Sequence, residues 1–159
     1  MLPLPSLDTG SKYKVCCGKE LCSGCIHAVG LRDNGVGLCP FCRTPAPVSG
    51  EEYIARLKKR VEVGDAIAIY SLGCCYDEGV YGFPLDHTKA LELWPQAGEL
   101  GYARAYHNIG GLYNNGVVGV ERDKKKANHY YELAAMGGDA TARHNLGIFE
   151  GRLELWMGH

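Results

Sequence analysis

The sequence has no excess of charge of either sign and no long apolar run. Its 159 residues carry 17 Lys and Arg against 18 Asp and Glu, a formal net charge of −1. Proteins that bind nucleic acid usually have a basic excess, because their cations displace the counterions of phosphate. Gly, Asp and Lys interrupt every apolar stretch before it reaches the roughly 18–20 residues that span a bilayer. Nucleic-acid and membrane partners are therefore disfavoured.

The N-terminal end also lacks the pattern of a secretory signal. Residues 1–5, MLPLP, have neither a basic start nor a continuous apolar core, and two prolines would disrupt a helix there. We therefore expect an intracellular protein, cytoplasmic or nuclear, in a reducing compartment. In such a compartment, clustered cysteines indicate a metal site rather than disulfide bonds.

Six of the eight cysteines lie within 27 residues and form the clearest chemical signal of the chain. Two pairs have the C-x2-C spacing, which lets a tight turn direct two thiolates at one tetrahedral ion. A segment of about 45 residues buries too little apolar surface to fold alone, whereas a structural zinc contributes about 10–16 kcal/mol of apparent binding free energy. We expect Zn²⁺ to be required for folding here, with ligands drawn from Cys16, Cys17, Cys22, Cys25, Cys39 and Cys42.

The cysteine pattern resembles the last six ligands of an all-cysteine RING finger. Residues 16–25 read CCGKELCSGC and residues 39–43 read CPFCR, and the resemblance covers about residues 12–47. RING fingers hold two zinc ions in a cross-brace, in which ligand pairs one and three share one ion and pairs two and four share the other. The resemblance therefore implies one complete site at Cys16, Cys17, Cys39 and Cys42, with Cys22 and Cys25 as half of a second site.

The sequence leaves the number of zinc ions open. No Cys or His precedes Cys16, where a RING finger has its first ligand pair, and we expect that Met1 is a misassigned start. In an alternative arrangement, a zinc ribbon, Cys22, Cys25, Cys39 and Cys42 surround a single ion. His27 is a further candidate ligand, although a lone His more often lies on a surface.

The resemblance also implies a function, because RING fingers act as ubiquitin ligases. They bind a ubiquitin-conjugating enzyme and orient its thioester, and they contribute no catalytic nucleophile of their own. Ile26, Pro40 and Phe41 match positions that contact the conjugating enzyme, and Arg43 matches the cation that bridges enzyme and ubiquitin. Because the first ligand pair is missing, whether the chain is an enzyme stays open.

The rest of the chain repeats with a period of 37 residues. The pattern predicts two helices in each unit. Asp86 and Asp123 stand at the expected N-caps of the second helix, and Gly101 and Gly138 stand where the chain leaves that helix. The pattern resembles the Sel1-like repeats, relatives of tetratricopeptide repeats, which implies an α/α superhelix that binds proteins. The matched positions are Gly64, Gly101 and Gly138; Ala68, Ala105 and Ala142; Leu72, Ile109 and Leu146; and Gly73, Gly110 and Gly147.

The repeat also accounts for several side chains that could otherwise be interpreted as a ligand-binding site. Trp94, His107, Tyr130 and Tyr131 are expected to pack between helices rather than to bind a ligand. Cys74 and Cys75 are likewise predicted to be helix packing residues. Pro95 falls inside a predicted helix, where proline costs about 3 kcal/mol.

The sequence thus predicts a mainly α protein with a RING-like zinc-binding segment at residues 1–47. Residues 48–63 form a linker and a helix that opens with a capping box at Ser49 and Glu52. Its basic run, Arg56–Arg60, and the run Lys124–Lys126 are predicted to be solvated. Residues 64–157 hold the repeats, in units at 64–100, 101–137 and a partial 138–157.

Two functions remain open from the sequence. One is a RING-type ubiquitin ligase whose repeats hold a substrate beside the conjugating enzyme. The other is a non-catalytic scaffold or adaptor in which zinc only folds the N-terminal segment. A third function, nucleic-acid binding by a zinc ribbon, is disfavoured by the charge balance.

Overall fold

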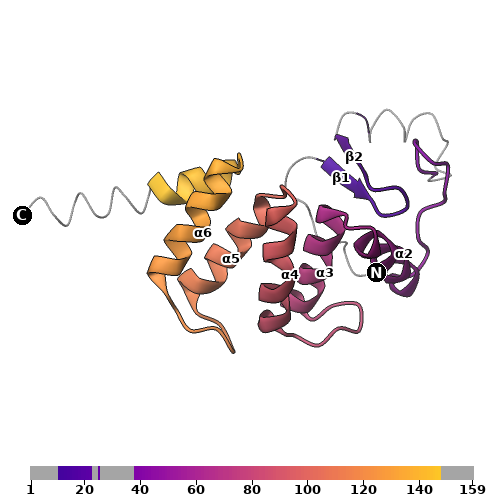
Figure 1. Cartoon of the computed structure of the whole chain (residues 1–159). Coiled ribbons are helices and arrows are strands. Elements are labelled where there is room, and N and C mark those ends of the chain that lie inside the picture. Colours follow the sequence, from indigo (N-terminus) through magenta and orange to yellow (C-terminus); the bar gives the residue numbers. More distant parts are fainter. Residues whose placement is uncertain (1–10, 23–24, 26–37, 148–159) are drawn as a thin grey trace, which may run out of the picture.

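The computed structural model describes residues 11–22, 25 and 38–147, and it is mainly helical (Figure 1). One β-hairpin lies at the indigo end, beside the first helices of a row that runs to the yellow end. The predicted fold class is confirmed. The elements are β1 (Ser11–Lys14), β2 (Lys19–Cys22), α2 (Gly50–Glu62), α3 (Ala66–Glu78), α4 (His87–Glu99), α5 (Arg104–Asn115) and α6 (Lys124–Met136), and residues 140–147 are also helical.

The helices follow the predicted period. α4 and α6 begin and end 37 residues apart, and each packs against the helix before it, α3 and α5 respectively. α4 also packs against α5, which joins the two helix pairs. Among the described residues, no helix is both long and apolar enough to cross a membrane.

Short polar side chains start these helices, as predicted. Asp86 accepts a hydrogen bond from the N–H of Lys89, and Asp123 accepts one from Lys126, each at 3.0 Å. Ser49 caps α2 by accepting from the N–H of Glu52, while the Glu52 carboxylate reaches back to the N–H of Val48. These bonds satisfy N–H groups that the first helical turn leaves without partners.

The residues predicted to pack between helices do so, although His107 and Tyr130 are only half-buried, His107 beside the ring of Tyr131 and Tyr130 beside that of Tyr106. Trp94 is only 1% exposed and donates its indole N–H to the carbonyl of Tyr70. Cys74 and Cys75 are buried in α3, and Tyr131 is buried in α6. Helix α4 continues through Pro95 to Glu99, so proline is accommodated inside a helix.

The basic run of α2 differs from the prediction of a solvated face. Arg56 pairs with Glu52 and donates to the carbonyl of Pro45, and Arg60 donates to the carboxylate of Asp65. Lys58 and Lys59 are exposed. The two arginines differ from the prediction because Pro45 and Asp65, in the segments before and after α2, come within hydrogen-bond distance of their guanidinium groups.

Candidate metal centre

The β-hairpin presents two of the cysteines in its turn. β1 and β2 pair antiparallel up to Lys14 and Lys19, which leaves residues 15–18 to reverse the chain. The N–H of Gly18 donates to the carbonyl of Lys14 at 2.8 Å, with φ of 71° at Gly18, a conformation that glycine adopts without steric cost. Cys16 and Cys17 therefore stand side by side at the tip.

A second turn presents the other two cysteines. The N–H of Cys39 donates to the carbonyl of Thr44 at 2.8 Å, and the N–H of Arg43 donates to the carbonyl of Cys39 at 2.9 Å. Arg43 has a φ of 60°, a left-handed conformation uncommon for a residue with a Cβ. This tight loop turns Cys39 and Cys42 toward the hairpin.

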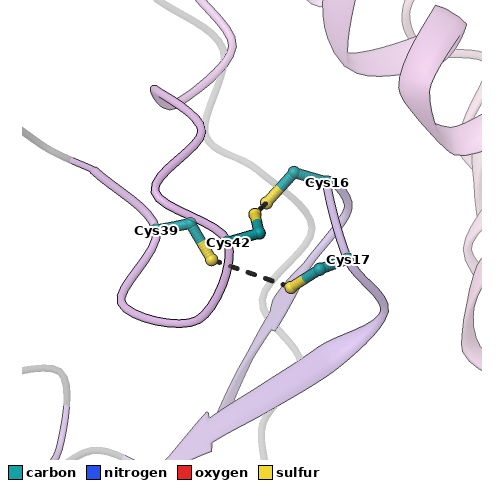
Figure 2. A group of neighbouring side chains, drawn as sticks. All are labelled: Cys16, Cys17, Cys39 and Cys42. Atoms are coloured by element: carbon teal, nitrogen blue, oxygen red, sulfur yellow. Dashed lines mark hydrogen bonds between the residues drawn. The ribbon is translucent and has the colours of Figure 1, made fainter.

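The four sulfur atoms meet in one cluster, in which all lie within 4.8 Å of one another (Figure 2). The Sγ atoms of Cys17 and Cys39 are 3.7 Å apart, and those of Cys16 and Cys42 are 3.4 Å apart. Zinc–sulfur bonds of about 2.3 Å place the sulfurs of a tetrahedral site about 3.8 Å apart, whereas a disulfide requires about 2.05 Å. The spacing thus fits four thiolates around one ion.

The thiols of this cluster influence one another's protonation. Burial, together with hydrogen bonds to Cys42 and Cys39, raises the pKa of Cys16 to about 12. Hydrogen bonds from the side chain and backbone of Thr44 lower the pKa of Cys42 to about 6. Four thiolates at this spacing repel one another, so a divalent cation among them would favour their deprotonated forms.

Cys22 and Cys25 lie apart from this cluster. The N–H of Cys25 donates to the Sγ of Cys22 at 3.3 Å, the kind of bond that orients thiolates in metal-binding turns. Within the described part of the chain, the sulfurs that gather are those of the cross-brace arrangement, and the zinc-ribbon set of Cys22, Cys25, Cys39 and Cys42 does not come together.

The residues predicted to contact a conjugating enzyme lie beside the cluster where they are described. Phe41 is 52% exposed, Arg43 is exposed and Pro40 is half-buried, all on the loop that carries Cys39 and Cys42. Ile26 and His27 lie outside the described residues.

Sequence reasoning missed two hydrogen bonds, one at the cluster and one that anchors the hairpin to the helices. Thr44 bonds to Cys42 at 3.2 Å, and Tyr13 bonds to Asp65. Tyr13 lies 52 residues from its partner, and no spacing pattern signals so distant a pair. For Thr44, the only signal in the sequence is a hydroxyl two residues after a predicted ligand.

The helix pairs and their period define an α/α repeat protein. Residues 66–102 and 103–139 match the Sel1 repeat model, so these two units are Sel1 repeats. No RING-finger model match supports the resemblance of the cysteine-rich segment. No curated protein matches the chain.

Solved structures with the same repeats resemble this chain. A Sel1 repeat protein from Oxalobacter formigenes is 34% identical with a TM-score of 0.57, over 60% of this chain and 38% of its own. A protective antigen present in uropathogenic Escherichia coli strains, which displays an SLR fold, is 30% identical with a TM-score of 0.58, over 64% of this chain and 22% of its own. This chain thus spans less than half the length of either protein.

Proposed function

We propose that the chain is a protein-interaction adaptor in which Zn²⁺, held by Cys16, Cys17, Cys39 and Cys42, orders a small head on a Sel1 repeat array. The observation that carries this proposal is the cluster of four sulfurs within 4.8 Å, drawn from two turns far apart in the sequence. We also propose a reducing location, in the cytoplasm or nucleus, because these thiols act as ligands only when reduced.

The donor set favours zinc in a structural role. Thiolates are soft ligands that select zinc, copper(I) or iron–sulfur clusters, and four of them in a tetrahedron are typical of structural zinc. Such a site has no open position for substrate, so it contributes folding free energy rather than catalysis. Stacked repeats present an extended surface to other proteins, which supports protein partners for the array.

Zinc content of matched cysteine variants tests this proposal. Elemental analysis of purified protein should find that Cys16→Ser loses about one zinc per chain relative to the wild type. Cys22→Ser, the matched control, should keep that zinc because its sulfur lies outside the cluster. Protein without metal, or greater loss from Cys22→Ser, would contradict the site.

A RING-type ubiquitin ligase is the second candidate. It is favoured by the exposure of Phe41 and Arg43 on the loop that holds two proposed ligands. In this proposal Ile26, Pro40 and Phe41 contact the conjugating enzyme, Arg43 bridges to ubiquitin, and the repeats hold a substrate.

Autoubiquitination with a panel of conjugating enzymes separates the two candidates. A ligase should form product that Phe41→Ala and Arg43→Ala each reduce at unchanged zinc content. If the zinc-loaded chain forms no product with any enzyme of the panel, the adaptor function stands alone.

A further inference from the structure

The cysteine hairpin is packed into the helical array. Val15, next to Cys16 in the hairpin turn, is only 5% exposed. It shares one apolar cluster with Leu57 of α2 and with Ala68 and Cys75 of α3, all three fully buried. The turn that carries two of the four thiols is therefore part of the same core as the first repeat.

A single carboxylate joins the hairpin to the start of α3. The Oδ2 atom of Asp65 accepts from the hydroxyl of Tyr13 at 2.9 Å and from Nη2 of Arg60 at 2.6 Å. Its Oδ1 atom caps α3 by accepting from the N–H groups of Ile67 and Ala68, at 3.1 and 3.3 Å. Tyr13, on β1, thus contacts the residue that begins the first repeat.

The second cysteine turn is fastened to α2 at a different point. Nη1 of Arg56 donates to the carbonyl of Pro45 at 2.7 Å, three residues after Cys42. Both segments that meet at the sulfur cluster are therefore attached to helices, the hairpin to α2 and α3 and the loop to α2. A metal ion held by both segments would therefore link the hairpin and the loop to each other, in addition to the contacts that each makes with the helices.

We infer that metal binding at the cluster stabilises the first repeat, so that the hairpin and the loop form a metal-dependent cap on the α2–α3 end of the array. This inference rests on the proposed zinc site and deepens it. A ligand that binds only the native state stabilises every part that unfolds with its site. In repeat arrays each unit contacts only its neighbours, so the effect should be largest in α2 and α3 and smallest in α6.

The core continues from the cap toward Trp94, which supplies a spectroscopic probe. Val61 of α2 packs against the cluster around Val15 and also against the cluster that contains Trp94. Trp94 is buried in α4, and Trp156→Phe leaves it as the only tryptophan of the chain. Its fluorescence then reports unfolding of the first repeat without a signal from the cysteine segment.

The test compares full-length zinc-loaded protein with the same protein in a strong chelator. Chelation should lower the Trp94 unfolding midpoint by several degrees. Hydrogen exchange should accelerate in α3 and change little in α6, the internal reference. An unfolding midpoint and α3 exchange that do not respond to chelation of bound zinc would overturn the inference while leaving the zinc site in place.

A matched pair of variants separates the contacts from the metal. Tyr13→Phe with Val15→Ala leaves all four cysteines, so at saturating zinc it should still hold one ion per chain, yet its midpoint should shift less on chelation. Tyr13→Phe alone removes one hydroxyl group, and it replaces the double variant in this comparison if the double variant does not fold. Undiminished shifts in variants that bind zinc would overturn the inference, whereas wild-type protein without zinc would overturn the site as well.

Discussion

Gly73 of α3 lies directly against the indole ring of Trp94 in α4. A Cβ atom at Gly73 would stand 2.5 Å from Nε1 of Trp94, closer than real side chains approach. One repeat further on, a Cβ at Gly110 would stand 2.7 Å from the ring of Tyr131. The repeated glycine therefore makes room for an aromatic ring at the same point of each helix pair.

Gly73→Ala should destabilise the protein by about 1–3 kcal/mol, because the added methyl group overpacks a buried contact. The measurement is the free energy of unfolding in denaturant. Gly147 is the matched control, since it occupies the same repeat position and a Cβ there meets no atom of the described residues within 4 Å. Gly147→Ala should be neutral or stabilising by up to about 1 kcal/mol. Equal effects of the two substitutions would contradict this account of the glycine.

The carboxylate of Asp65 should make the free energy of unfolding depend on pH in the acidic range. Burial raises its pKa, but hydrogen bonds from Arg60, Tyr13 and the N–H of Ala68 outweigh burial and hold the pKa below its usual value. A lowered pKa means that the ionised form stabilises the folded state above about pH 4 and that this contribution is lost as pH falls through the folded pKa.

Asp65→Asn keeps the shape of the side chain and removes its charge, so it isolates this effect. The difference in unfolding midpoint between wild type and Asp65→Asn should be largest near neutral pH and shrink below about pH 4. Denaturant titrations at several pH values measure this difference. A difference that stays constant with pH would refute the role of the charge.

Thr44→Val should weaken zinc binding without removing a ligand. The Thr44 hydroxyl lies 3.2 Å from the Sγ of Cys42, and such contacts orient metal ligands. Loss of a contact of this kind typically costs about 10–100-fold in metal affinity. Competition with a chromophoric chelator measures the change. Thr44→Ser keeps the hydroxyl and is the matched control, which should retain affinity near that of the wild type.

Pro95→Ala should stabilise α4. Proline inside a helix lacks the N–H that the carbonyl of Leu91 would accept, a loss of roughly 3 kcal/mol relative to alanine. The thermal unfolding midpoint should therefore rise. Glu132 occupies the equivalent position in α6, so Glu132→Pro should lower the midpoint. A fall on Pro95→Ala would mean that packing of the ring outweighs the missing hydrogen bond.

Local patterns predicted most of the helical array. Asp86 and Asp123 act on N–H groups three residues away, and the glycines repeat because every unit makes the same internal contacts. Such contacts recur along the sequence, so the period reveals them. The repeat period also predicted the helix that contains Pro95, although proline has a low helix propensity, because tertiary packing overrides local helix preference.

The sequence by itself determined the repeat, its caps and the set of cysteines able to bind a metal. Only the tertiary structure decided which four sulfurs gather, because Cys22 and Cys16 carry the same thiol and differ only in where β2 and the hairpin turn place them. It also decided that the hairpin rests on α2 and α3 through Val15 and Asp65. Contacts between segments so far apart depend on how the whole chain packs, and no short-range spacing encodes them.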